Sequence, residues 1–295
     1  MEFKESLKEK SKYIESLLNE YMPIEEGYQA TIMKAMNYSL KAGGKRLRPI
    51  LTLEACKIVG GNEKDALPFA IAIEMIHTYS LIHDDLPALD NDDLRRGKPT
   101  NHKVFGEAMA VLAGDSLLNY AFEVMLSNSI NKENPEKYLR AINEIAKSSG
   151  IHGMIGGQVV DVESENKTIS KDKLDFIHLN KTAAIIIGCM RAGAIIGNAN
   201  AEELEKITRY GKNIGLSFQI VDDILDIIGD ESKLGKHVGS DIENHKSTYP
   251  SLLGLEESKA IAKQLIDEAK ENIKDLKEDS RFLDGLADYI IDREY

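Results

Sequence analysis

The side chains best suited to chemistry are aspartates that gather in two clusters. The first comprises Asp84, Asp85 and Asp90, in the run HDDLPALD, where Pro87 ends an apolar helical segment. Carboxylates ~4 Å apart repel by about 4 kcal/mol at an effective dielectric of 20, and a helix C-terminus adds negative potential. A cation is therefore expected to share the cluster, and oxygen ligands favour Mg²⁺ over zinc. Taken alone, the stretch could also be an acidic, solvated loop.

The second cluster, Asp222, Asp223 and Asp226 in FQIVDDILD, lies far down the chain. Asp222 and Asp226 are four residues apart and share one helix face, with Gln219 beside them. The flanking residues are almost all apolar, which argues against a solvated face. Since unpaired charge is costly in an apolar interior, the carboxylates are expected to face a cavity. Two such clusters across one cavity could hold several Mg²⁺ ions together with phosphate oxygens.

Basic residues follow in two groups that suit anionic oxygens. Gly43-Gly44 ends one helix and is followed by Lys45, Arg46 and Arg48, a corner that lacks the Walker pattern. Arg95-Arg96-Gly97-Lys98 comes directly after the first aspartate cluster. Each group could be a basic surface turn, but phosphate oxygens would suit both of them and the metal sites. His77 lies two helical turns before Asp84 on the same face. It could be a site residue or a histidine of the core.

The elements that must position these residues are helices. Helical spacing predicts segments at 2–20, 29–40, from 49 onward, 64–85, 105–127, 135–162, from about 173 to 197, 202–228, and one or two beyond 251. Gly150, Gly153 and Gly156 recur within one segment, for close packing or for substrate room. The long loop 229–250 is typical of a functional loop or lid. No alternating β-pattern is visible. We expect one all-α domain, residues 1–295, a bundle of roughly ten or more helices around a central cavity.

Composition excludes several classes of protein. The chain has 295 residues and a net charge of −12, which argues against a nucleic-acid partner. Cys56 and Cys189 lie in apolar runs, which favours buried free thiols over a disulfide. The N-terminal segment lacks the apolar core of a signal peptide, and no run approaches ~20 uninterrupted apolar residues. We therefore expect a cytoplasmic protein without stable membrane insertion.

With these motifs in view, the chain resembles the trans-isoprenyl diphosphate synthases (polyprenyl synthetases), most closely the bacterial-type farnesyl diphosphate synthases. The resemblance runs from AMNYSLKAGGKRLRP through HTYSLIHDDLPALDNDDLRRGKPT and FQIVDDILD to LGKHVGSDIENHKSTYP. It implies the isoprenyl synthase fold, usually as a homodimer, with two or three Mg²⁺ ions per site, Mn²⁺ being an alternative. The implied reaction is the head-to-tail condensation of isopentenyl diphosphate with dimethylallyl or geranyl diphosphate, giving farnesyl diphosphate and diphosphate.

The resemblance also implies roles for individual residues. The metal ligands would come from Asp84, Asp85, Asp90, Asp222, Asp223 and Asp226. The allylic diphosphate would contact Arg95, Lys181, Thr182, Gln219, Lys236 and Lys246, of which Lys181, Thr182 and Gln219 would be catalytic. Isopentenyl diphosphate would contact Gly44, Lys45, Arg48, His77 and Arg96.

Product length is predicted to depend on Tyr79, with the small Ser80 beside it. Five residues before Asp84, at 1.5 Å each, places Tyr79 about 7–8 Å down the helix from the pinned diphosphate. An aromatic floor at that depth suits a C15 product better than C20, and the resembling family pairs a tyrosine here with farnesyl products.

Other functions fit the sequence less well. A geranylgeranyl synthase shares every motif and differs in cavity depth. A terpene cyclase or a squalene-type synthase would not need the second diphosphate pocket at Lys45 and His77. A non-catalytic partner subunit usually lacks one aspartate motif, and a purely structural protein leaves the carboxylates unexplained. The sequence leaves open the product length, the starter, the metal and the dimer contacts.

Overall fold

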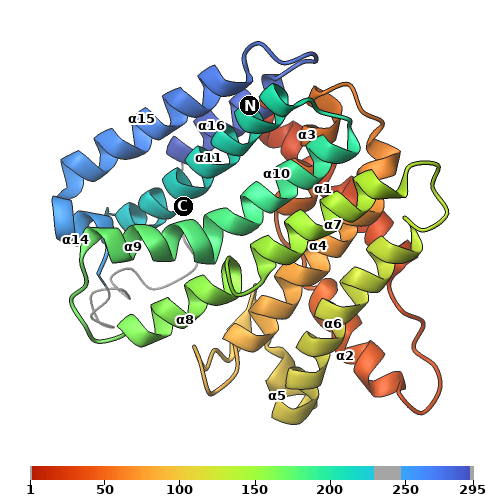
Figure 1. Cartoon of the computed structure of the whole chain (residues 1–295). Coiled ribbons are helices and arrows are strands. Elements are labelled where there is room, and N and C mark those ends of the chain that lie inside the picture. Colours follow the sequence, from red (N-terminus) through yellow and green to blue (C-terminus); the bar gives the residue numbers. More distant parts are fainter. Residues whose placement is uncertain (1, 229–246, 293–295) are drawn as a thin grey trace.

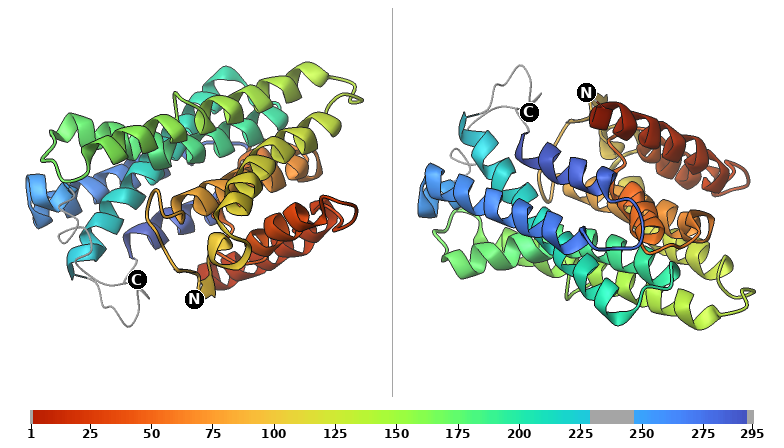
Figure 2. Two further views of the ribbon diagram at one scale, coloured as in Figure 1. Left: turned by 90° about the horizontal axis from the view of Figure 1, so that it is seen from below. Right: turned by 90° about the horizontal axis from the view of Figure 1, so that it is seen from above.

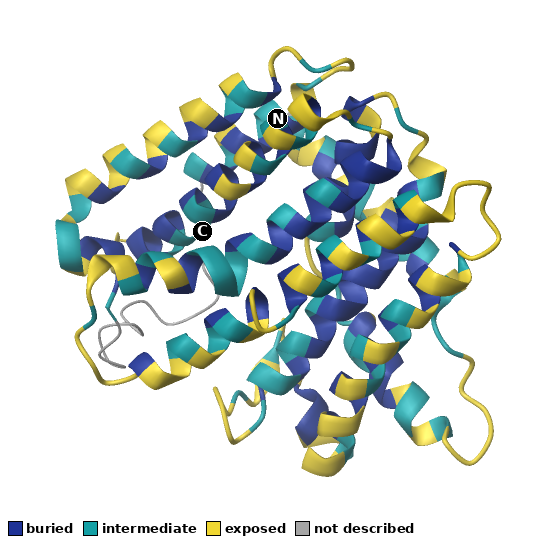
Figure 3. Cartoon of the chain, in the orientation of Figure 1, coloured by how far each residue is buried: buried dark blue, intermediate teal, exposed yellow. Residues whose placement is uncertain are grey.

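The apolar segments form the interior of a bundle of helices, shown in Figure 1 as a computed structural model that describes residues 2–228 and 247–292. The predicted all-α class is confirmed. The central helices are α3 Leu47–Ile58, α4 Glu63–Asp84, α10 Ala184–Ile196 and α11 Ala201–Ile228. Helix α4 is apolar almost all round, so it is buried between its neighbours, and buried residues concentrate along these helices in Figure 3.

Amphipathic helices surround this centre, each with one apolar face turned inward. They are α1 Glu2–Tyr21, α2 Ala30–Leu40, α6 Glu107–Ser127, α7 Pro135–Ser149, α8 Met154–Ser164, α15 Leu255–Ile273 and α16 Arg281–Ile291. The views in Figure 2 show α1 and α16 near each other, although they come from opposite ends of the chain. Phe3 joins them, with its ring centroid 5.2 Å from that of Phe282 and 5.5 Å from that of Tyr289.

Short elements complete the described chain: α5 Asn101–Phe105, α9 Lys171–Ile177, a π-helical segment η1 His178–Ala183, α14 Tyr249–Leu253, and strands β1 Leu94–Arg95 and β2 Lys98–Pro99. The two strands pair antiparallel, so the expectation of no β-structure was wrong at this one hairpin. It turns through Arg96 and Gly97, which both have positive φ. The cysteines are free and buried, as predicted.

The helix predicted over 135–162 is in fact two helices. The chain leaves α7 after Ser149 and enters α8 at Met154. A side chain at Gly153 would place its Cβ 2.2 Å from the Ser148 carbonyl oxygen, so only glycine allows this close passage. The predicted helix from about 173 to 197 is also interrupted, by the π-helical segment. Beyond residue 251 two further helices begin, α15 and α16, in agreement with the prediction.

Two segments are long and apolar enough to span a membrane by length and composition, Glu107–Ser127 and Lys171–Ile196. The first is α6, and the second runs through α9, η1 and α10. Each packs one face on the bundle: α6 packs on α4, and α10 packs on α3, α7 and α11. Their apolar faces therefore belong to the protein core, as is common for the core helices of a bundle.

Candidate active site

The predicted site residues line three adjoining hollows. The basic hollow has Gly44, Lys45, Arg48, His77 and Arg96 in its wall. The apolar cavity, about 470 Å³, is lined by Tyr79, Ser80, Asp84, Thr182 and apolar residues of α8. The acidic hollow holds Asp161, Gln219, Asp222 and Asp223. Arg48 and His77 belong to both the basic hollow and the apolar cavity, and Lys181 belongs to both the apolar cavity and the acidic hollow. The three hollows therefore adjoin one another through shared side chains.

Some predicted residues lie apart from these hollows. Asp90 is exposed on the loop after α4 and has its backbone N–H bonded to the Asp84 carbonyl, at 2.8 Å. Asp226 is buried on α11, and Asp85 and Arg95 line a separate small hollow beside the β1–β2 hairpin. Lys236 and Lys246 lie outside the described residues.

Asp84 ends α4 at the mouth of the apolar cavity. The pKa of this carboxyl is raised to about 6, chiefly by burial and also by Asp90 and Asp85, against the lowering effect of Lys181 and Arg95. The ionised carboxylate is therefore held in an environment that favours a nearby positive charge. Such a group fits a cation ligand.

Asp85, the next residue, is already paired. Its carboxylate accepts hydrogen bonds from Nε and Nη2 of Arg95, the first of them at 2.8 Å. Arg95 also donates to Asp92, at 3.1 Å. Asp85 is 3% exposed, so this ion pair anchors the β1–β2 hairpin against the end of α4. Asp85 thus holds the guanidinium of Arg95 in position.

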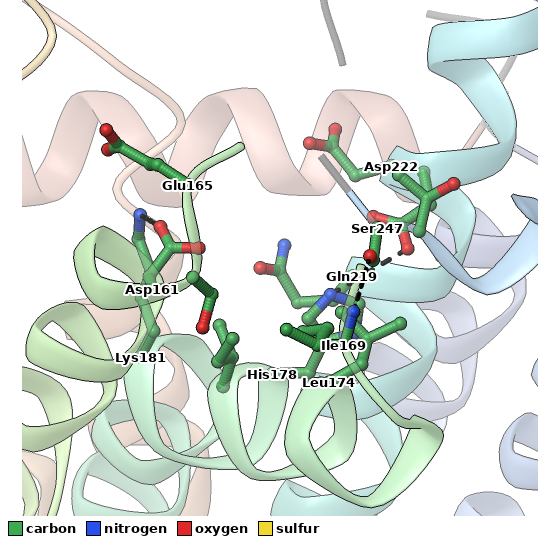
Figure 4. A pocket seen from close by; sticks show the side chains of 13 residues that line it. Asp161, Glu165, Ile169, Leu174, His178, Lys181, Gln219, Asp222 and Ser247 are labelled. Atoms are coloured by element: carbon green, nitrogen blue, oxygen red, sulfur yellow. Dashed lines mark hydrogen bonds and ion pairs between the residues drawn. The ribbon is translucent and has the colours of Figure 1, made fainter. Parts of the chain in front are cut away.

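The second cluster is held by neighbours on two other elements. Asp223 accepts a hydrogen bond from the backbone N–H of Tyr249, at 2.9 Å, and its Oδ2 lies 3.7 Å from Nε2 of His178. The His178 ring stacks on the Tyr249 ring with 5.6 Å between centroids. Burial lowers the pKa of His178 to about 4, so this histidine is neutral at pH 7. Asp222, one residue earlier, faces the acidic hollow (Figure 4).

Lys181 and Thr182 project from the π-helical segment. Such segments place one extra residue in a helical turn and are frequent at functional sites. Lys181 Nζ lies 2.6 Å from Asp161 Oδ2, across the hollow from Asp222 in Figure 4. Burial alone would lower the pKa of Lys181, but Asp161, Asp84 and Asp90 raise it overall. Thr182 donates to the side-chain oxygen of Gln219, at 2.8 Å, and so ties this segment to α11.

Close packing of α8 positions the same segment. A Cβ at Gly157 would lie 2.1 Å from the backbone nitrogen of Lys181. The glycines of this region therefore allow close packing. Gly153 does so at the break between the two helices, and Gly157 does so against the backbone of Lys181. Gly157 lies outside the series Gly150, Gly153 and Gly156 noted in the sequence.

The corner between α2 and α3 holds the basic hollow. Gly43 and Gly44 have φ of 86° and 131°, and a Cβ at Gly44 would lie 2.6 Å from the Arg96 guanidinium. Arg96 donates to the Gly43 carbonyl oxygen. Arg48 Nη1 lies 3.3 Å from Nε2 of His77, which must accept because arginine only donates. The pKa of His77 is lowered well below its ordinary value, mainly by burial and next by the positive charge of Arg48. The His77 side chain is therefore neutral in this hollow.

Arg46 also lines the basic hollow, but its guanidinium is paired with a buried carboxylate. It has φ of 51° and turns inward, where Nη1 lies 2.6 Å from Glu74 Oε1 and Nη2 donates to the Leu40 carbonyl at 2.7 Å. Both side chains are 2% exposed. This buried ion pair fixes the corner to α4 one turn before His77, so it sets the shape of the basic hollow.

Sequence reasoning left two of these residues without a role. Asp161 carried a signal, because it follows Gln158 on one helix face, but its partner Lys181 lies 20 positions away. Glu74 carried none, since it is an acidic residue within an apolar helix.

The aspartates fit a hard divalent cation by their donor chemistry. In the residues that the structure describes, no group of three His, Cys, Asp or Glu side chains comes together closely enough to hold a metal ion. The Arg48 Nε is buried without a hydrogen-bond partner in the same described part of the chain, which fits an anionic ligand. A divalent cation at these carboxylates would therefore need further oxygen ligands from outside the described protein groups.

Comparison with known proteins defines the class. The polyprenyl synthetase family matches residues 29–282. The chain is 51% identical to the farnesyl diphosphate synthase of Bacillus subtilis (strain 168), over 90% of each chain. It is 49% identical to a chloroplastic geranylgeranyl pyrophosphate synthase of Capsicum annuum, over 99% of this chain and 79% of that one. A solved apo structure of an FPP/GFPP synthase from Zymomonas mobilis superposes with a TM-score of 0.87 at 37% identity, covering 98% of this chain and 99% of that one.

The fold and the site thus define an enzyme of the prenyltransferase class. The chain belongs to the polyprenyl synthetase family.

The buried Arg46–Glu74 pair gives a stability prediction. Glu74→Gln keeps the side-chain shape but leaves the guanidinium buried without its counter-charge. The free energy of unfolding, measured by urea titration, should fall by about 3–5 kcal/mol. Glu205→Gln, which breaks an exposed pair with Arg209, is the control and should cost about 0–1 kcal/mol. Equal small losses in both variants would contradict the role of the buried pair.

The raised pKa of Asp84 gives a pH prediction for the metal-free protein. Because the pKa in the folded state is about 6, against an ordinary 3.8, ionisation costs the folded state more than the unfolded one. This cost is fully present above pH 6, declines between pH 6 and pH 4, and is absent below. Asp84→Asn should therefore raise the free energy of unfolding by up to about 3 kcal/mol at pH 7.5.

The gain in Asp84→Asn should shrink towards zero near pH 4 when unfolding is followed in EDTA across the range. Asp267→Asn, on the exposed face of α15, should show no such pH-dependent gain. A gain that is the same at every pH would show that the Asp84 charge is not its cause.

Proposed function

We propose that this chain catalyses the Mg²⁺-dependent head-to-tail condensation of isopentenyl diphosphate with dimethylallyl and geranyl diphosphate, giving farnesyl diphosphate and diphosphate. The observation that carries the proposal is that the three hollows adjoin one another. The apolar cavity, which Tyr79 lines, shares Arg48 and His77 with the basic hollow and Lys181 with the acidic hollow. An allylic diphosphate with an apolar tail and a second diphosphate would fit this arrangement.

The allylic diphosphate is proposed to bind between the aspartate clusters. Bound Mg²⁺, held by Asp84, Asp90 and Asp222 with support from neighbouring aspartates, would supply positive charge to the leaving diphosphate. Lys181 would leave Asp161 and place its ammonium group on the same oxygens, with Arg95 beside it. Thr182 and Gln219 would orient the substrate near C1. Charge stabilisation in a dry site favours breaking the C1–O bond.

Isopentenyl diphosphate is proposed to bind in the basic hollow, on Lys45, Arg48 and Arg96, beside neutral His77. Arg48 and His77 also line the apolar cavity, so the hydrocarbon end of this substrate would lie next to the allylic carbon. Its double bond would form the new carbon–carbon bond with C1. A proton then leaves the adjacent carbon for the departing diphosphate, and a new double bond forms. The apolar lining keeps water from the carbocation.

A geranylgeranyl product is the second candidate, because the Capsicum annuum relative is as similar as the bacterial farnesyl synthases. Tyr79 favours the shorter product, since its ring is 5% exposed and lies in the wall of the apolar cavity. Ser80 beside it is too small to block a tail.

The direct test is product analysis. Purified full-length protein is incubated with radiolabelled isopentenyl diphosphate, each allylic starter and Mg²⁺ or Mn²⁺, and the dephosphorylated products are separated by chain length. The proposal expects C15 and no reaction in EDTA. A C20 product would establish the alternative, and the absence of any condensation would overturn both.

The two diphosphate sites give a kinetic prediction. Arg48→Ala should raise the KM of isopentenyl diphosphate, because it removes a positioned cation from the basic hollow. Lys181→Ala should raise the KM of the allylic substrate and lower kcat, since that contact tightens as the leaving group gains charge. Lys64→Ala, on the exposed first turn of α4, is the control. A change confined to the allylic KM in Arg48→Ala would contradict the assignment.

Tyr79 gives a product-length prediction. Tyr79→Ala removes the ring and lengthens the apolar cavity, so the main product should shift from C15 to C20 or longer. As a large-to-small change in the core, it should cost about 3 kcal/mol of stability. Chromatography of the products is the measurement, with circular dichroism to check folding. A folded variant that still stops at C15 would place the floor elsewhere.

We also propose a single domain, residues 1–295, that forms a cytoplasmic homodimer. One connected core runs through the described helices, and α6 exposes Val111, Leu112 and Leu126 on its outer side. Leu112→Glu should convert a dimer into a monomer in analytical ultracentrifugation, because a charge opposes burial of that face. Leu139→Glu, equally exposed but on α7, should leave the mass unchanged. A monomeric wild-type protein would contradict the proposal.

A further inference from the structure

His83 lies in the last turn of α4, between Tyr79 and Asp84, and the reaction described above gives it no role. Its side chain is about one-quarter exposed and lines the apolar cavity. The polar nitrogens of an imidazole need hydrogen-bond partners when they lie in the wall of an apolar cavity.

The ring of His83 is fixed against α6. Its Nε2 lies 3.1 Å from the Val111 carbonyl oxygen, so Nε2 must carry the proton and donate it. A Cβ built at Gly114 would lie 2.1 Å from the same Nε2 and 2.5 Å from Cδ2. The imidazole therefore fills the space that any other residue at 114 would need. Asp115 Oδ1, at 4.0 Å, borders the ring on the same helix.

The other side of the imidazole contacts Tyr79. The two rings are one helical turn apart on α4, with 5.7 Å between centroids and 80° between planes, the edge-to-face arrangement that aromatic pairs favour. Tyr79 therefore rests on a ring that is itself held by a hydrogen bond and by a glycine on the neighbouring helix.

We propose that His83 is a positioning residue for product length: it holds the Tyr79 ring across the apolar cavity by bracing it against α6 at Gly114. The inference rests on the proposed function, in which Tyr79 is the floor. Without the imidazole, the space at Gly114 becomes available to the phenol ring. The ring would then turn out of the tail's path, and the cavity would lengthen although Tyr79 is still present.

The test compares the products of His83→Ala with those of the wild-type enzyme, using geranyl diphosphate, isopentenyl diphosphate and Mg²⁺. We expect the ratio of C20 to C15 to rise by about tenfold, the scale set by losing one aromatic pair. The Mg²⁺ concentration for half-maximal rate should not change, since Asp84 keeps its place. His152→Ala, exposed in the turn between α7 and α8, is the matched control and should leave the ratio unchanged.

Gly114→Ala tests the brace from the other helix. Its methyl group would displace the imidazole, so we expect it to raise the same ratio in the wild-type background. In the His83→Ala background the methyl refills part of the space into which the phenol ring would turn, so it should lower the ratio towards the wild-type value. Because alanine favours helix over glycine, this variant keeps the test available if His83→Ala does not fold.

The product lengths distinguish a failure of the proposed function from a failure of the role of His83. A wild-type enzyme without C15 product would remove the proposed function and this inference with it. A wild-type enzyme that makes C15, with folded His83→Ala and Gly114→Ala variants that also stop at C15, would overturn the inference alone. A lower rate or a changed Mg²⁺ requirement at constant product length would likewise overturn it, since His83 would then act through Asp84.

Discussion

The structure depends on keeping like charges apart around an apolar interior. Carboxylates of α4 and α11 approach the cavity from two sides, and the cations of the α2–α3 corner occupy a third. Two buried charges in the described part of the chain are paired with an opposite charge, Arg46 with Glu74 and Asp85 with Arg95. A buried pair that loses one member is strongly destabilising, so these two pairs hold the α2–α3 corner and the β1–β2 hairpin in place against α4.

The sequence predicts most of this arrangement because its signals are local. The apolar run of α4 indicates a buried helix, and Asp222 and Asp226 at i and i+4 indicate one face of another. The glycine pair before Lys45 indicates a turn, and its positive φ values bear that out. In each case the residues that define the feature are neighbours in sequence, so spacing alone is sufficient.

What the sequence does not predict depends on contacts across the fold. Arg46 reads as a third cation for a substrate until Glu74, 28 positions away, is seen to face it. The π-helical segment depends on how closely α8 approaches Lys181 at Gly157, and helical periodicity cannot report that distance. The break at Gly153 was read as continuous helix because glycine is compatible with both. Propensity is weak at each of these positions, and tertiary packing decides.

The ion pair between Lys181 and Asp161 also determines which ligands the acidic hollow can accept. The ammonium group already has a full counter-charge at 2.6 Å, so a newcomer must offer it more negative charge than a single carboxylate does. A diphosphate meets that condition, whereas a prenyl alcohol with the same tail does not. Under the proposed function, the hollow would therefore bind the diphosphate in preference to the alcohol formed by its hydrolysis, because the alcohol lacks the charge needed to displace Asp161.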